Sequence, residues 1–375
     1  MLHVAHVSFF TDSEGRPPNV LLDSWPSLVD VAEAAAGGGT RVTVIQSCSH
    51  RERLERNGIP YHFLPFGHRG VTSASRADFY GLLQHIAPDV LHVHGLGFPR
   101  QLHALARARP QLPILVQDHA SGPPRIWRRP AWRRGLAVAN GFAFCSRAQA
   151  LPFVELGLIP KHTMVFEIPE SSSRFTPGDR EDARRKVGIH GNPAVLWVGH
   201  LDENKDPLTV FRGLSAAVGR LPEAQLWCCF GKAPLLEQVR RLIRSDPMLG
   251  DRVHLLGRVP HEQIEVLMRA ADLLVLGSHR EGSGYSLIEA LACGLPAAVT
   301  DIPSFRALTG NGAVGQLWRC DDSHGLAEAI VNLASNRGAS QRSAVRAHFE
   351  AELSFAALGR KLGSAYREIV AQGVT

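Results

Sequence analysis

The chain has 375 residues, more than one hydrophobic core usually serves, so its length favours two domains. A formal charge of +6, with only five lysines among 41 basic residues, suits acidic ligands such as diphosphates and is too mild to indicate nucleic acid. Six cysteines without a Cys-x-x-Cys pair argue against a disulfide framework or a zinc site, and no apolar run reaches the ~18–20 residues of a membrane span.

The N-terminal half alternates short apolar runs with amphipathic segments, which predicts a doubly wound parallel sheet. Its first ten residues lack the basic segment and long apolar core of a signal peptide, so we expect a cytoplasmic protein. The glycines at 37–39 are expected to end a helix. The expected strands are Leu2–Val7, Val42–Ile45, Tyr61–Leu64, Val90–Val93, Ile114–Val116, Phe142–Cys145 and Met164–Ile168, and the expected helices include Trp25–Ala36, Phe79–Ile86 and Gln101–Arg107.

Two of these strands end in histidines. The run LHVHG places His92 and His94 on the same side of one strand, because alternate residues of a strand share a face. The run ILVQDHASG places Asp118 and His119 at the end of the next strand. For each histidine, a hydrogen-bonded packing role and a ligand role remain equally open.

The most basic stretch is RIWRRPAWRR, residues Arg125–Arg134, in which five arginines alternate with Trp127 and Trp132. Such a mixture suits a membrane interface, an anionic acceptor or a lipid-phosphate carrier. A solvated helix face with both tryptophans in the core explains the pattern slightly better. The following segment, Ile168–Asp179, is expected to link the two domains.

The C-terminal half is organised around residues 271–300, which predict a strand, a loop, a helix, a turn and a second strand. Leu273–Leu276 is a short apolar run, and the three glycines of the loop after it stop the strand. The helix from Tyr285 to Cys293 should end at Gly294 in a left-handed conformation. Ligands of open α/β sheets bind at such loops, and the helix N-terminus suits a phosphate.

Two carboxylates lie in this unit, Glu281 in the loop and Glu289 in the helix. A carboxylate accepts two hydrogen bonds at once and so suits a vicinal diol, whereas the small residues Gly282, Ser283 and Gly284 let a ligand approach the backbone. A nucleotide sugar supplies a ribose, a diphosphate and a sugar. Taken alone, however, the two glutamates are more simply explained as ordinary exposed carboxylates.

The longer pattern EGSGYSLIEALACGLP strongly resembles the donor-site motif of family-4 retaining glycosyltransferases, also called group 1. The resemblance implies a GT-B fold, in which two Rossmann-like domains face a cleft: residues 1–172 for the acceptor, residues 173–350 for the donor, and a C-terminal helix, 351–375, that crosses back. It also implies that Glu281 meets the donor sugar and Glu289 the ribose. Tyr285 replaces the more usual leucine.

Other segments of the second domain are similar to the same family. GHLDENKDP, after the expected strand Ala194–Val198, resembles a G-R-L-x-x-x-K motif whose arginine and lysine clamp the donor diphosphate. Lys205 matches the lysine, but His200 stands at the arginine. Either Arg258 or Arg280 supplies the missing charge, or the donor binds in a different pose. The loop with Arg258 and Val259 is expected beside the nucleobase. Asp206 should cap the next helix, and Phe349–Val370 should form one helix.

The first domain resembles the family more weakly. A family histidine that approaches the donor sugar corresponds to His119, with His94 as the runner-up, and Asp118 would orient His119 or serve the acceptor hydroxyl. Arg125 and Trp127 would line the acceptor entrance. The usual glycine pair after the first strand is reduced to Gly15. The resemblance makes His119, Glu281 and Lys205 the expected catalytic residues.

The expected activity is transfer of a sugar, with retention, from a UDP- or GDP-sugar to an acceptor hydroxyl in glycan, exopolysaccharide or glycolipid synthesis. The partners are a nucleotide-sugar donor and a carbohydrate or lipid-linked acceptor, with no metal or cofactor, no nucleic acid and an open question of peripheral membrane contact through residues 125–134. Two alternatives remain: a GT-B sugar-nucleotide 2-epimerase, and a nucleotide-binding protein without catalysis.

Overall fold

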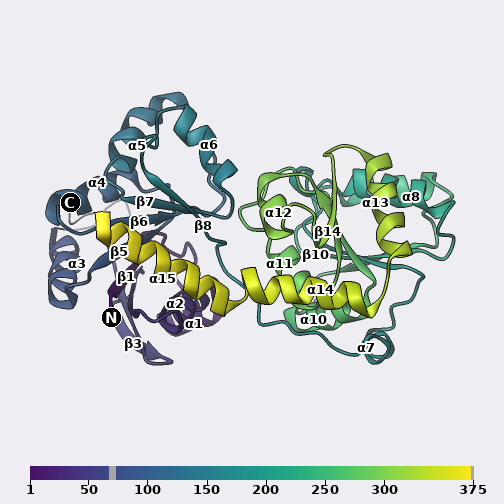
Figure 1. The fold of residues 1–375 in the computed structure, drawn as a ribbon, viewed down its shortest axis with the longest axis horizontal. Coiled ribbons are helices and arrows are strands. Elements are labelled where there is room, and N and C mark those ends of the chain that lie inside the picture. Colours follow the sequence, from purple (N-terminus) through teal and green to yellow (C-terminus); the bar gives the residue numbers. More distant parts are fainter. Residues whose placement is uncertain (67–72, 373–375) are drawn as a thin grey trace. The chain divides into compact units, whose positions relative to one another are not determined.

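The computed structural model describes residues 1–66 and 73–372 (Figure 1). The chain forms two compact units. One contains Met1–Ser171 together with the chain from Phe355 on, and the other contains Ser172–Ser354. The boundaries expected from the sequence, after residues 172 and 350, lie one and four residues from these divisions.

The first unit is built on an eight-stranded sheet with the order β3-β4-β2-β1-β5-β6-β7-β8. All pairs are parallel except β3 with β4. The strands are β1 (His3–Ser8), β2 (Arg41–Ser47), β3 (Glu52–Arg56), β4 (Ile59–Leu64), β5 (Val90–His94), β6 (Ile114–Gln117), β7 (Gly141–Phe144) and β8 (Met164–Glu167). The buried strands that the sequence predicts are therefore present, with ends that differ by one or two residues.

Strand β3 is the exception, because the sequence analysis did not identify it. Its sequence, ERLER, is polar and mostly exposed, as suits the edge of a sheet. It pairs with β4 through a two-residue turn in which Asn57 and Gly58 have φ values of 52° and 75°. Positive φ at both positions is what a tight hairpin turn requires, and Asn-Gly supplies it at low cost.

Helices cover both faces of this sheet, and apolar clusters lie on each side of it (Figure 1). The final helix, α15, packs on α2, where the two backbones approach closely: a Cβ on Gly38 would lie 2.2 Å from the carbonyl oxygen of Gly359. Gly38 therefore allows the close contact between α2 and α15, in addition to following the end of α2. The helices are α1 (Pro18–Ser24), α2 (Pro26–Gly37), α3 (Ser73–Ile86), α4 (Pro99–Ala108), α5 (Arg129–Leu136), α6 (Arg147–Glu155) and α15 (Phe355–Gln372).

The second unit is a six-stranded parallel sheet with the order β11-β10-β9-β12-β13-β14. Its strands are β9 (Ala194–Gly199), β10 (Gln225–Phe230), β11 (Val253–Gly257), β12 (Leu273–Leu276), β13 (Ala297–Thr300) and β14 (Gly315–Trp318), and its helices are α7 (Arg180–Val187), α8 (Pro207–Val218), α9 (Leu236–Ser245), α10 (His261–Ala270), α11 (Tyr285–Ala292), α12 (Pro303–Leu308), α13 (Ser323–Ser335) and α14 (Ala339–His348). Central β12 is fully buried, so the loop after it starts from a rigid strand.

A buried carboxylate ties the N-terminal edge of this second sheet together. The side chain of Asp272, just before β12, is only 1% exposed. It accepts hydrogen bonds from the guanidinium groups of Arg180 and Arg184, both at 2.8 Å, and from Arg337 at 3.3 Å. The backbone N–H of Ala194 donates to it at 2.8 Å. One anion thus holds α7, β9 and the segment after α13.

The sequence predicts one continuous helix over Phe349–Val370, and this prediction is wrong. Residues Phe349–Leu353 form a π turn, and Ser354 then takes an extended conformation with φ −60° and ψ 161° before α15 begins at Phe355. The break falls at the division between the two units. Among the described residues, no helix combines the length and apolarity needed to cross a bilayer.

Candidate functional site

The loop between β12 and α11 packs closely on the loop between β9 and α8. A Cβ on Gly277 would lie 3.1 Å from the backbone oxygens of Lys205 and Asp206, so any larger residue would push this loop slightly away from the β9–α8 loop. Backbone bonds then join the two loops: the His279 N–H donates to the carbonyl of Asn204 at 2.8 Å, and the Asn204 side chain donates to the carbonyl of Arg280 at 3.0 Å. The two loops form one platform.

This platform brings together two of the predicted site residues, Lys205 and Glu281, as an ion pair between Nζ and Oε1. Their side chains are 23% and 13% exposed, so the pair is shielded from water without being fully buried. Lys205 is fixed because Asp202 caps its turn, accepting from the Lys205 N–H at 3.0 Å. Asp206 caps α8 as expected, accepting from the Thr209 N–H at 3.1 Å.

The second glutamate lies one helix further on. Glu289, on α11, accepts a hydrogen bond from Nε2 of His261, the first residue of α10, at 2.7 Å. The bond to this carboxylate raises the pKa of His261 above its ordinary value, against the opposing effect of partial burial. The carboxylate expected to hold a ribose is therefore occupied by a partner that the sequence motif does not name.

The other predicted donor residues lie on or near the same platform. Gly284 caps α11 with φ 76°, and a Cβ there would lie 2.6 Å from Phe305, so the site requires glycine. Gly282 and Ser283 are buried, and Tyr285 is 42% exposed at the start of the helix.

The residues expected to complete the phosphate clamp and the base site lie on exposed loops. His200 is exposed, and its Nδ1 accepts the backbone N–H of Lys232 at 3.2 Å. Arg258 and Arg280 are also exposed, and Val259 is half-buried after β11. His200 is thus tied to the start of the loop after β10.

In the first unit, His119 is oriented by a glutamate and not by its neighbour in sequence. Nδ1 of His119 lies 3.0 Å from Oε2 of Glu170. Asp118 turns away and accepts the backbone N–H of Ser121 at 2.9 Å, so the expectation that Asp118 orients His119 is not met. Burial raises the pKa of Asp118 above its ordinary value.

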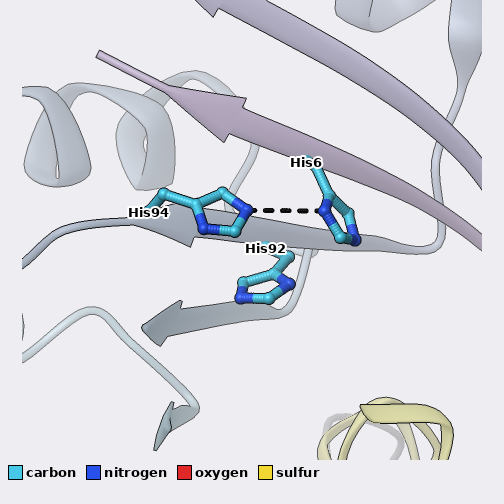
Figure 2. Close-up of side chains that lie close together, drawn as sticks. All are labelled: His6, His92 and His94. Atoms are coloured by element: carbon cyan, nitrogen blue, oxygen red, sulfur yellow. Dashed lines mark hydrogen bonds between the residues drawn. The ribbon is translucent and has the colours of Figure 1, made fainter. Parts of the chain in front are cut away.

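Three more histidines extend inward from His119. The rings of His92 and His94, on β5, stack with centroids 4.4 Å apart, and His6 on β1 lies beside them. Figure 2 shows these three rings, with the hydrogen bond between Nε2 of His94 and Nδ1 of His6, 3.4 Å long. We call His6, His92 and His94 the histidine cluster. Burial holds the pKa of His6 at about 3 and those of His92 and His94 well below the ordinary value.

The basic stretch Arg125–Arg134 divides between surface and core. Ile126 and Trp127 are 70% and 68% exposed, and the guanidinium of Arg125 lies over the Trp127 ring at 5.4 Å. Trp132 instead is buried and stacks near Phe153. Trp132 therefore belongs to the core, as was expected of both tryptophans, whereas Trp127 projects from the surface beside Arg125.

Comparison with known proteins decides the family. A family model described as Glycosyltransferase Family 4 matches residues 27–166, and one described as Glycosyl transferases group 1 matches residues 179–348. A D-inositol 3-phosphate glycosyltransferase of Mycobacterium sp. (strain KMS) is 30% identical over 395 residues, which cover 90% of this chain and 88% of that protein. The chain belongs to the family-4, group 1 glycosyltransferases.

Further likenesses agree with this assignment. A D-inositol 3-phosphate glycosyltransferase of Nocardia farcinica (strain IFM 10152) is 26% identical over 338 residues, 84% of this chain and 72% of that protein. The solved structure of Anabaena Alr3699/HepE in complex with UDP matches with a TM-score of 0.71 and 18% identity, covering 98% of this chain and 100% of that one. The predicted GT-B fold is confirmed, and the enzyme is a glycosyltransferase that acts on a sugar donor.

The sequence analysis of this glycosyltransferase missed four residues that contact predicted site residues or extend their network. Glu170 was expected only as part of the linker between the domains, and His261 was not singled out. His6 and Tyr366 carry no motif, yet the Tyr366 hydroxyl from α15 lies 3.1 Å from Nε2 of His6 and 2.8 Å from Nδ1 of His92. A histidine on the first apolar strand was the one available signal, because a buried strand seldom carries a polar ring without a partner.

Among the described residues of this glycosyltransferase, two groups of side chains bring potential metal ligands together. One is the histidine cluster, whose rings already have hydrogen-bond partners. In the other, Nε2 of His279 lies 3.6 Å from Oδ2 of Asp206 and 3.8 Å from Oδ1 of Asp321. Both distances lie within the range of ion pairs between side chains.

Proposed function

We propose that this glycosyltransferase transfers a sugar, with retention of anomeric configuration, from a UDP- or GDP-sugar to an acceptor hydroxyl. The observation that carries the proposal is the pairing of Lys205 with Glu281 on one platform, with Glu289 on the helix that follows. A cation, a loop carboxylate and a helix carboxylate match the diphosphate, sugar and ribose of a nucleotide sugar. The UDP complex of the Anabaena neighbour supports a uridine donor.

Lys205 has the clearest chemical role in this proposal. As the bond from sugar to phosphate breaks, negative charge grows on the leaving nucleoside diphosphate, and a fixed ammonium group stabilises it more than it stabilises the bound donor. Glu281 holds the ammonium in position before the donor arrives, and one of its oxygens then serves the sugar hydroxyls. The leaving phosphate accepts the proton of the acceptor hydroxyl, so no protein nucleophile and no metal are required.

The acceptor in this proposal is a carbohydrate or a lipid-linked carbohydrate. The name of the Mycobacterium relative, a D-inositol 3-phosphate glycosyltransferase, describes a phosphorylated polyol as acceptor. The exposed Ile126 and Trp127, flanked by arginines, suit an anionic lipid surface, because tryptophan favours the interface and arginine its phosphates. We therefore propose peripheral contact with the cytoplasmic face of a membrane.

The first experiment is thermal stabilisation by UDP, GDP, ADP and their sugar conjugates, with and without EDTA. A ligand that binds the folded state raises Tm, and the stabilisation grows with the logarithm of its concentration divided by its Kd. We expect one nucleotide series to stabilise the wild type but not Glu289→Ala, while Glu237→Ala, which removes an exposed glutamate of α9, behaves as the wild type. Stabilisation by none of the nucleotides would remove the main support for the donor site.

Turnover then separates the alternatives. The transferase predicts a product whose new bond has the anomeric configuration of the donor, seen by NMR, and only when an acceptor is present. A sugar-nucleotide epimerase would convert the donor alone, and a binding protein would show stabilisation without turnover. For the membrane, Ile126→Ser with Trp127→Ser should abolish flotation with anionic vesicles, and binding that is unchanged would exclude this surface.

A further inference from the structure

A continuous chain of hydrogen bonds runs from the partly exposed His119 into the core of the first unit. Outward, Nδ1 of His119 lies 3.0 Å from Glu170. Inward, Nε2 of His119 lies 3.2 Å from Nδ1 of His94, and Nε2 of His94 lies 3.4 Å from Nδ1 of His6. Nε2 of His6 then meets the Tyr366 hydroxyl, which also meets Nδ1 of His92 (Figure 2 shows the three inner rings). His119, His94 and His6 each use both ring nitrogens.

The inner end of this chain decides which way its hydrogens point. Within the described part of the chain, Nε2 of His92 and Oε1 of Gln117 are buried without a partner at hydrogen-bond geometry. The two side chains lie on the same face of adjacent strands, because Gln117 is the register partner of His94, two residues after His92. In agreement with this placement, Gln117 raises the pKa of His92 against the larger lowering by burial. Exchanging the amide N and O of Gln117 does not resolve this mismatch. Its Nε2 donates to the carbonyl of Pro169 at 3.2 Å, and after the exchange two oxygens would face each other there.

Two hydrogen arrangements are available. If every imidazole is neutral and the donors point toward Glu170, Nε2 of His92 is left as a lone pair opposite Oε1 of Gln117, and two buried acceptors face each other. Reversing the inner bonds gives Nε2 of His92 a hydrogen to donate to Gln117 and leaves no described atom of the chain unsatisfied. The reversal needs one additional proton, held at His119, which then donates both to Glu170 and to His94. Buried polar atoms are satisfied wherever possible, which favours the second arrangement.

We infer that Gln117, His92, Tyr366, His6 and His94 form a hydrogen-bonded relay that keeps hydrogen on both ring nitrogens of His119. The charge then sits at the partly exposed end beside the Glu170 carboxylate, and the buried rings stay neutral, as their lowered pKa values require. A metal in the histidine cluster would instead have to displace at least one of the hydrogen bonds of His6 and His94, since each uses both ring nitrogens.

The relay makes His119 a hydrogen-bond donor. This role rests on the proposed function only in the assumption that substrate approaches Nε2 of His119. In the proposed reaction, a substrate oxygen that replaced Nδ1 of His94 as the partner of Nε2 would receive a hydrogen bond from His119. Tyr366 and Gln117 are positioning residues, since they act on His119 through other rings. The ionisable groups around His119 are Glu170, Asp118, His94 and His92.

The test uses long-range ¹H–¹⁵N NMR of the histidine rings in the full chain, without substrate. At neutral pH we expect Nε2–H tautomers at His6, His92 and His94 and the doubly protonated pattern at His119. Tyr366→Phe should break the relay, mix the tautomers of His6 and His94, and move the alkaline limb of kcat/KM to lower pH by about half a unit, a threefold change in proton affinity. Tyr61→Phe is the matched control, because Tyr61 is as fully buried and its hydroxyl has no partner among the described residues.

Nδ1–H tautomers in the inner rings of the wild type would overturn the relay, and that result requires no variant to fold. A ring spectrum that changes on addition of EDTA would also overturn it, because a bound metal would then hold the rings. A correct ring spectrum together with absent turnover would instead contradict the proposed transferase and leave the relay intact.

Discussion

The bond between His261 and Glu289 predicts that the donor site competes with its own histidine. A ribose that binds both oxygens of Glu289 competes with Nε2 of His261, which lies 2.7 Å from Oε1. The His261 side chain is 67% exposed, so solvent screens the pair, and exposed pairs of this kind contribute about 0.2–1 kcal/mol. His261→Asn should therefore tighten nucleotide binding by roughly 1.4-fold to fivefold.

The pH dependence has a definite sign. Because Glu289 raises the pKa of His261, the ion pair is complete below the ordinary histidine pKa and is lost as pH rises through the raised value. Nucleotide affinity in the wild type should thus increase between about pH 6 and about pH 8, and this increase should disappear in His261→Asn.

Isothermal titration calorimetry with the nucleotide that stabilises the wild type measures both effects. His324→Asn, on an exposed part of α13, controls for loss of a histidine as such. Weaker binding by His261→Asn at both pH values would refute the competition and make His261 a residue that orients Glu289 for the ribose.

Three further changes test the framework around the site. Asp272→Ala removes the buried anion shared by three partly exposed arginines and leaves the buried Ala194 N–H without an acceptor, which should cost about 1.5–3 kcal/mol, a fall in Tm of roughly 3–12 °C by calorimetry. Gly284→Ala should fold less stably and lose nucleotide stabilisation in the thermal assay, because its φ of 76° and its contact with Phe305 both exclude a Cβ. Ser146→Ala removes the side-chain acceptor of a capping box completed by Gln149 and should lower unfolding free energy by about 1 kcal/mol in urea, with nucleotide binding unchanged.

The sequence predicts the donor platform well because its information is local. The strand, loop, helix and strand of residues 271–300 follow from an apolar run, three glycines and a helical spacing, and the structure has Leu273–Leu276 and the start of α11 at Tyr285 as expected. Gly294 takes the expected left-handed conformation, with φ 68°. Pairing of Lys205 with Glu281 follows once both loops lie at the carboxyl ends of adjacent strands, β9 and β12.

The partners of the site residues could not be predicted, because each is distant in sequence and lies outside a motif. Tyr366 contacts His6 across 360 residues, and Glu170 contacts His119 across 51. Such contacts depend on the path of α15 and on the end of β8, which local patterns do not encode. Strand β3 was missed for another reason: an edge strand needs no apolar run, so its sequence is that of a polar loop.

The two donor-side carboxylates share a property that bears on selectivity. In the unliganded second unit, Glu281 is neutralised by Lys205 and Glu289 by His261, so each expected ligand contact exchanges an existing partner for a new one. A ligand that offers only a diol separates Glu289 from His261 and provides no anion to pair with the protonated imidazole. A ligand that offers only a phosphate draws Lys205 from Glu281 and leaves a carboxylate without a hydroxyl. A molecule that carries a ribose, a diphosphate and a sugar would replace both pairs at once, so we expect the proposed donor site to discriminate against free sugars and simple phosphates.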